Sequence, residues 1–73
     1  MRGIVIKFND KLGYGFIKNR NFEKDIFVHY SAIIQDGYKT LNKGDIVDFD
    51  FDNKLIKATN VQVIRKGYKY TKQ

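Results

Sequence analysis

The stretch GYGFIKNRNFEKDIFVHY, residues 13–30, decides the fold. It contains two short runs of alternating residues, 14–18 and 26–30, which are separated by a polar segment at 19–25. Alternation with a period of two indicates β-strands, because successive side chains of a strand point to opposite faces of a sheet. The sequence therefore predicts two neighbouring strands joined by a polar loop.

The same alternation assigns the side chains of these two strands to faces. One face carries aliphatic side chains that are expected to enter the core: Ile17, Ile26 and Val28. The other face carries rings that are expected to lie outside: Tyr14, Phe16, Phe27 and His29. Gly15 lets the strand bend tightly around a small barrel. The alternative is that the rings form the core, which would bury the histidine and expose the aliphatic residues.

Three further runs have the pattern of short strands, at residues 4–8, 46–51 and 55–64. Turn-forming Asn, Asp and Gly residues separate them, and residues 31–34 have room for one helical turn. Five short strands predict an all-β domain, and we expect a small five-stranded antiparallel OB-type barrel, because closure removes exposed sheet edges. An SH3-like barrel with the same number of strands is the alternative fold.

The outer rings favour a binding surface. Exposed aromatic side chains grouped on one face are costly without a partner, and every nucleic-acid base has a flat face that can stack on them. Lysines flank the rings in the sequence and could contact phosphates. The pattern therefore favours sequence-tolerant binding of single-stranded nucleic acid. A barrel that uses the same rings to bind another protein is the alternative function.

Two motifs and their order resemble a known family. GYGFI at 13–17 resembles the first ribonucleoprotein motif, and IFVH at 26–29 resembles the second. With YSAI at 30–33 they are similar to the bacterial cold-shock domain, and the resemblance runs from residue 3 to about residue 64. The RNA-recognition motif is excluded, because it has the two signatures in reverse order.

The resemblance implies an OB barrel that binds single-stranded RNA and DNA and acts as an ATP-independent nucleic-acid chaperone in transcription or translation. It also implies which positions bind. Carried over to this chain, with Lys7 at a departure from the family pattern, the nucleic-acid-binding residues are Lys7, Phe8, Tyr14, Phe16, Phe27, His29, Tyr30, Tyr38 and Lys39.

The chain departs from the family pattern at several of these positions. The usual Lys-Trp pair of the first strand is Ile6-Lys7 here, which exchanges a stacking surface for a phosphate contact. Leu12 stands where a lysine is usual, and the loop at 52–57 is short and lacks the usual Gly-Pro. Tyrosines replace phenylalanines at some positions. We expect binding of the family type with altered affinity and a stronger salt dependence.

The net charge of +6 is unevenly distributed. Residues 65–73 hold four Lys or Arg and no acid, which gives +4, whereas residues 1–64 hold ten Lys or Arg and eight acids, which gives +2. The sequence thus predicts a barrel at 1–64 and a basic tail at 65–73. The tail either binds nucleic acid or keeps the protein soluble.

Composition narrows the possible functions. The 73 residues include no cysteine and one histidine, which excludes disulfides and thiolate sites and makes a histidine-built metal site improbable. We expect no metal, no cofactor and no enzyme activity, although a small nuclease is a further alternative. No signal peptide or membrane span is visible, so the expected location is cytoplasmic. The expected partners are single-stranded RNA and DNA, with no membrane and no small-molecule substrate, and the protein is a monomer or a strand-exchanged dimer.

Overall fold

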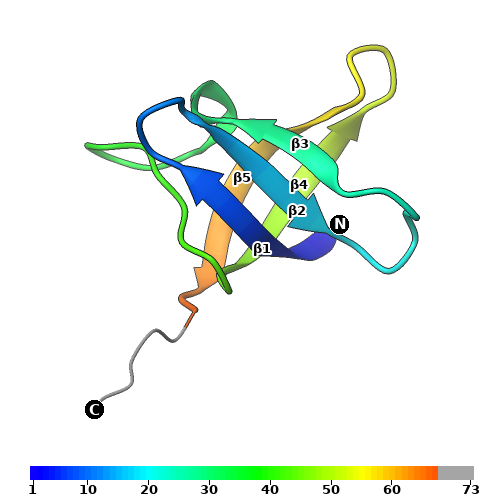
Figure 1. The fold of residues 1–73 in the computed structure, drawn as a ribbon, viewed down its shortest axis with the longest axis horizontal. Coiled ribbons are helices and arrows are strands. Elements are labelled where there is room, and N and C mark those ends of the chain that lie inside the picture. Colours follow the sequence, from blue (N-terminus) through cyan, green and yellow to red (C-terminus); the bar gives the residue numbers. More distant parts are fainter. Residues whose placement is uncertain (68–73) are drawn as a thin grey trace.

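The computed structural model describes residues 1–67 and shows a closed five-stranded barrel (Figure 1). The strand order around the barrel is β1-β2-β3-β5-β4, as expected for the OB-type barrel. The elements are β1 (Arg2–Asn9), β2 (Tyr14–Lys18), β3 (Ile26–His29), a 3₁₀ turn (Tyr30–Ala32), β4 (Ile46–Asp52) and β5 (Lys57–Arg65). The all-β prediction is confirmed, and the expected helical turn begins one residue earlier, at Tyr30.

The register of β2 and β3 confirms the predicted faces. Tyr14 pairs with His29 and Phe16 pairs with Phe27 across the antiparallel ladder, so these rings share one face. The opposite face of β2 and β3 is buried. Its members form part of a single core with residues from β1, β4, β5 and the segment that connects the 3₁₀ turn to β4: Val5, Ile17, Ile26, Val28, Ile33, Leu41, Val47, Phe49, Ala58 and Val61.

A β-bulge in β1 changes which side chains of that strand face outward. Val5 pairs with Ile17, but Lys7 pairs with Phe16, so an extra residue lies between the two pairs. Without the bulge, Lys7 would share the inward face of Val5. With it, Lys7 joins the outer face that carries the rings.

Gly15 allows β1 and β2 to approach each other closely after this bulge. A Cβ atom at Gly15 would lie 2.8 Å from the Phe8 Cα and closer still to the carbonyl oxygen of Lys7. Both are backbone atoms, which have little freedom to move away. The position therefore requires glycine because the backbones of β1 and β2 approach each other closely here, a reason additional to the tight bend that the sequence predicts.

The last strand begins later than predicted, at Lys57 instead of residue 55. The Asp52 carboxylate accepts hydrogen bonds from the backbone N–H groups of Lys54 and Leu55, at 2.9 and 3.0 Å, which forms a turn before the strand. Ile56 has a φ of 55°, in the left-handed region, and cannot continue a ladder there. Leu55 and Ile56 are consequently exposed.

The barrel closes between β3 and β5 through a sparse parallel seam. Phe27 pairs with Lys57, and the next bridge is between Ile33 and Val61. The Ile34 N–H also donates to the Val61 carbonyl oxygen at 2.7 Å. Between these two bridges the chain that follows β3 turns away from β5 and forms the 3₁₀ turn. The bridges therefore lie on either side of an unpaired gap.

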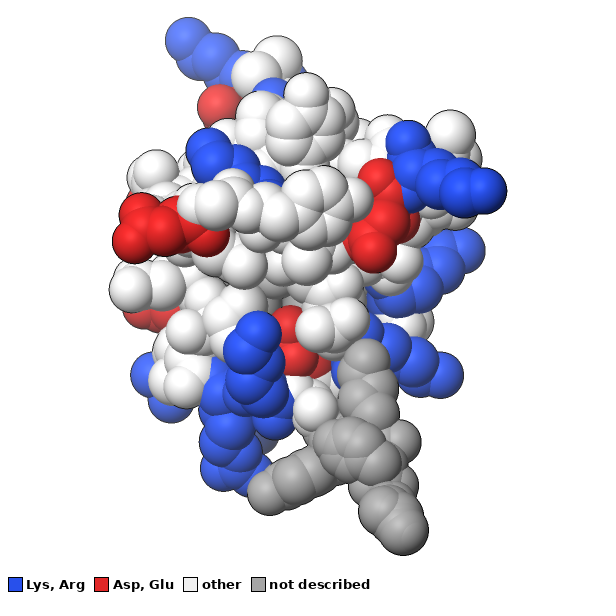
Figure 2. Space-filling view, turned by 90° about the vertical axis from the view of Figure 1, so that its left-hand side faces the viewer, with Lys and Arg blue, Asp and Glu red and all other residues white. Residues whose placement is uncertain are grey.

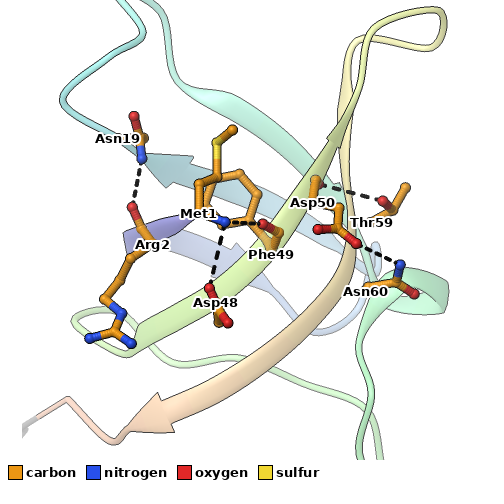
Figure 3. Close-up of polar contacts among 8 residues, drawn as sticks. All are labelled: Met1, Arg2, Asn19, Asp48, Phe49, Asp50, Thr59 and Asn60. Atoms are coloured by element: carbon orange, nitrogen blue, oxygen red, sulfur yellow. Dashed lines mark hydrogen bonds and ion pairs between the residues drawn. The ribbon is translucent and has the colours of Figure 1, made fainter.

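Polar contacts fix β1 against its neighbours (Figure 3). The Met1 amine donates to the Phe49 carbonyl oxygen at 2.7 Å and lies 3.6 Å from the Asp48 carboxylate, while the Asn19 amide donates to the Arg2 carbonyl oxygen at 2.6 Å. No helix among residues 1–67 is long and apolar enough to cross a membrane.

The buried Asp45 connects the start of β4 to residues 66–67. Its carboxylate accepts from the backbone N–H of Asn42 at 3.0 Å and from that of Gly67 at 2.7 Å. The barrel thus extends through Arg65, and Gly67 is held against its surface. Residues 68–73, which make up most of the predicted basic tail, lie outside the described residues.

Candidate nucleic-acid interface

Three partly exposed rings form a cluster on the outer face of β2 and β3. The ring centroids of Tyr14 and Phe27 are 5.6 Å apart, those of Phe16 and Phe27 are 6.0 Å apart, and those of Tyr14 and Phe16 are 6.1 Å apart. These distances are typical of packed aromatic pairs. The strand pairs hold the rings in a fixed arrangement, which we call the aromatic platform: Tyr14, Phe16 and Phe27.

Lys7 lies at the edge of the platform. Its Nζ atom is 5.5 Å from the centroid of the Phe16 ring, within the range of a cation–π contact. The side chain is exposed, so this contact is worth about 0.5–1 kcal/mol. The bulge in β1 therefore places a positive charge where the family pattern would place a flat ring.

His29 and Tyr30 extend the ring surface beyond β3. Their ring centroids are 4.4 Å apart. The backbone N–H of Ser31 donates to His29 Nδ1 at 3.2 Å, and the Ser31 hydroxyl lies 2.8 Å from the same atom. Because a backbone N–H can only donate, Nδ1 is the acceptor and the ring proton lies on Nε2. His29 thus keeps an N–H donor for another partner.

Tyr30 and Tyr38 both line a cavity of about 380 Å³, which we call the tyrosine cavity. The side chains of Tyr30 and Tyr38 are 49% and 68% exposed. The other lining residues come from the β1–β2 turn and from the loop between the 3₁₀ turn and β4: Asp10, Lys11, Leu12, Gly13, Gly37 and Lys39. The Thr40 hydroxyl donates to the Asp10 carboxylate, which ties the two walls together.

Gly13 is required at the base of the tyrosine cavity. Its φ is +75°, and a Cβ atom there would lie 2.6 Å from Cδ2 of Tyr30. The Tyr30 N–H donates to the Gly13 carbonyl oxygen at 2.8 Å. The ring therefore packs directly over the glycine backbone, and this places Tyr30 next to β2.

Phe8 is the residue of the predicted site that also packs against the hydrophobic core. It is half-buried and packs against the core, while its accessible part lines a cavity of about 240 Å³ with Lys7, Asn9, Tyr14 and Gly15. The structure thus places the remaining site residues on one connected surface: Lys7, Tyr14, Phe16, Phe27 and His29 on the strands, and Tyr30, Tyr38 and Lys39 around the tyrosine cavity.

Sequence reasoning missed one cation beside the platform. Lys57 pairs with Phe27 across the β3–β5 seam, so the two side chains emerge on the same face. This pairing joins strands that are distant in the chain, and no local pattern indicates it. Leu12, which is 63% exposed and lines the tyrosine cavity, was noted only as a departure from the family pattern.

Figure 2 shows the charges on the side of the molecule that faces left in Figure 1. Uncharged atoms, including aromatic rings, fill the centre of the upper half, and lysine and arginine side chains lie above, beside and below them. Acidic side chains are present on both flanks. The view agrees with an apolar surface surrounded by mixed charges with an excess of cations.

A closed five-stranded barrel with aromatic rings on the outer face of β2 and β3 defines the class of small OB-type binding domains. Residues 1–65 match the family described as "'Cold-shock' DNA-binding domain". The chain belongs to this family, whose members are nucleic-acid binders and not enzymes. The resemblance found in the sequence is thereby confirmed.

Curated relatives agree with this assignment. The chain is 45% identical over 65 residues to a cold shock-like protein of Aquifex aeolicus, which covers 86% of this chain and 93% of the relative. It is 44% identical over 66 residues to a cold shock-like protein of Thermotoga maritima, with 88% and 98% covered. It is 45% identical over 63 residues to cold shock-like protein CspE of Escherichia coli, with 84% and 91% covered.

Proposed function

We propose that this protein binds single-stranded RNA and DNA by stacking bases on the aromatic platform and in the tyrosine cavity. The observation that carries the proposal is the cluster of Tyr14, Phe16 and Phe27, three rings within 6.1 Å of one another on an outer strand face. A stacked base contributes roughly 1–3 kcal/mol whatever its identity. Several stacked bases therefore give tight binding with little sequence preference.

Polar groups around the rings orient the bound strand. His29 Nε2–H and the hydroxyl groups of Tyr30 and Tyr38 can donate to base edges or phosphate oxygens. Lys7 and Lys39 lie beside the platform and the tyrosine cavity, where they can contact phosphates. Such contacts make the affinity fall with salt, with a slope of roughly −0.7 in log units for each phosphate contacted.

The same mode of binding makes the protein an ATP-independent nucleic-acid chaperone. Rings that stack on bases can engage only unpaired nucleotides, so the protein binds the open form of a hairpin and shifts the equilibrium toward it. Effects on transcription or translation follow from this shift. We place this activity in the cytoplasm, in keeping with the family.

A double substitution of platform rings tests the proposal. Titration of a fluorescent single-stranded heptanucleotide in low salt should show binding by the wild type. The variant with Phe16→Ala and Phe27→Ala should bind at least about thirtyfold more weakly, since two stacks of roughly 1–3 kcal/mol each are lost. Phe22→Ala is the control, because that ring packs on Phe51, with the ring centroids 4.8 Å apart, and not on the platform.

Two results would contradict the proposal. The first is an absence of binding by the folded wild type. The second is equal affinity of the double variant and the wild type, which would show that the rings are not the contact surface. A quenched-hairpin assay then tests the chaperone step, in which the wild type should raise the open fraction without ATP and the double variant should not.

A further inference from the structure

A second cavity, of about 530 Å³, lies along the β5 side of the aromatic surface, and we call it the seam cavity. It lies beside the gap between the two bridges of the β3–β5 seam. Its walls are the segment after β3 and the first half of β5: Ser31, Ala32, Ile33, Ile34, Gln35, Asp36, Lys39, Lys57, Thr59 and Asn60. The size is within the roughly 300–1,000 Å³ of ligand sites in proteins.

Three contacts connect the seam cavity to the proposed base-binding surface. Lys57 lines the cavity and pairs with Phe27 of the platform. Ser31 lines it and lies 2.8 Å from His29 Nδ1 through its hydroxyl. Lys39 lines both the seam cavity and the tyrosine cavity. The seam cavity therefore runs beside the rings, and a strand that leaves them on this side enters it.

The chemistry of the seam cavity differs from that of the rings. None of its lining residues, all within the described range 1–67, is aromatic, so these residues offer no surface on which a base would stack. Its donor groups are two ammonium groups and two hydroxyl groups, from Lys39, Lys57, Ser31 and Thr59, together with amides, and one carboxylate, Asp36, also lines it. These are donors suited to phosphate oxygens and sugar hydroxyls.

Two carboxylates lie in or next to the seam cavity. Asp36 lines the cavity and opposes a phosphate there. Asp50 accepts a hydrogen bond from the Asn60 amide at 2.9 Å, which occupies part of that carboxylate. The cations thus outnumber the acid among the lining residues by two to one.

The walls of the seam cavity are fixed by the barrel. Ile33 is 2% exposed and bridges to Val61, and the Ile34 N–H donates to Val61 at 2.7 Å. On the other wall, Asn60 adopts a φ of 49° and is tied to Asp50. The cavity therefore exists before a ligand arrives, and binding in it does not require a segment to become ordered.

We propose that the seam cavity binds the sugar–phosphate chain of nucleotides that continue beyond the base-stacking surface. The inference rests on the proposed function, because the strand reaches the cavity from the rings. It extends that function by adding a subsite that reads the backbone and ignores the bases. Lys57 is its principal phosphate contact, with Lys39 shared between the two sites.

Oligonucleotides with abasic extensions test this subsite directly. The reference is a heptanucleotide, and the test ligands carry three abasic nucleotides at the 5′ end or at the 3′ end. The wild type should bind one of the extended ligands about two- to fivefold more tightly than the reference, which is the range of one exposed ion pair. Lys57→Gln should lose this gain, measured as the ratio of its own affinities for the extended ligand and for the reference.

Matched variants separate the subsite from a general charge effect. Lys54→Gln removes the same charge from the exposed turn that precedes β5 and should keep the gain. Asp36→Asn, at an exposed position, removes a negative charge from the cavity and should increase the gain in affinity that the extension gives. Thermal unfolding of each variant checks that the barrel is intact.

The outcomes for the two proposals are distinct. Failure of the wild type to bind the reference heptanucleotide would refute the proposed function itself. If the reference binds, the seam-cavity proposal is refuted by no gain at either end, by a gain that Lys57→Gln retains, or by one that Lys54→Gln loses equally.

Discussion

Replacing Lys7 by tryptophan should tighten binding and weaken its dependence on salt. The Lys7 amine is 5.5 Å from the centroid of Phe16, on the platform face, so an indole at this position would add a ring beside Phe16. One more stacked base contributes roughly 1–3 kcal/mol. Loss of an exposed phosphate contact costs about 0.2–1 kcal/mol. The mid-range difference of about 1.4 kcal/mol corresponds to a tenfold lower Kd.

The salt dependence gives a second and independent measure. Loss of one phosphate contact makes the slope of log K against log salt shallower by about 0.7. A tenfold rise in salt therefore widens the advantage of Lys7→Trp by about fivefold. Fluorescence titration of the heptanucleotide at several salt concentrations measures both quantities for wild type and variant.

Lys43→Trp is the control for added aromatic surface, because Lys43 is exposed and lies outside the platform and the tyrosine cavity. It should change neither affinity nor slope by a comparable amount. If Lys7→Trp leaves both the affinity and the slope unchanged while the barrel stays folded, Lys7 does not face the bound strand. The assignment of the bulge and of the platform edge would then be wrong.

Three further predictions concern the stability of the barrel, and urea unfolding followed by circular dichroism measures each. Gly15→Ala should destabilise the fold by about 3 kcal/mol, because the new Cβ would collide with backbone atoms; an unchanged midpoint would show that β1 can move away. Ile56→Gly should stabilise it by about 0.5–1 kcal/mol, since relief of the left-handed strain exceeds the added chain entropy; a loss of stability would contradict the strained φ of 55°. Asp45→Ala should cost about 2–4 kcal/mol, because two partly buried N–H donors lose their acceptor, and Asp45→Asn should cost less; equal costs would speak against this role.

The sequence was sufficient for the parts of the site that lie on regular strands. In β2 and β3 the alternation runs without interruption, so parity alone places Tyr14, Phe16 and Phe27 outside and Ile17 and Val28 inside. Because one face is aliphatic and the other aromatic, the sequence also shows which face of these strands enters the core. Here local pattern and tertiary structure agree.

The sequence pattern was insufficient where the ladder is irregular or closes over a long distance. Alternation from Val5 would turn Lys7 inward, and only the family resemblance placed it in the site. The Phe27–Lys57 pair joins residues from β3 and β5, so no local pattern reveals the cation or the seam cavity. The apolar side chains of Leu55 and Ile56 predict strand, but the hydrogen bond to the Asp52 carboxylate and the left-handed backbone of Ile56 form a turn there.

The sparse β3–β5 seam makes the barrel easier to open locally at this point than elsewhere. Elsewhere the strands are joined by runs of paired residues, but β3 and β5 share the Phe27–Lys57 pair alone, followed by the Ile33–Val61 bridge. Local opening is easiest where few backbone hydrogen bonds must break. Amide protons at this seam should therefore exchange with solvent sooner than those of the β1–β2 ladder. A nucleic-acid strand bound across Phe27 and Lys57 would hold β3 and β5 together. Its binding should therefore slow the exchange of amide protons in both strands at the seam.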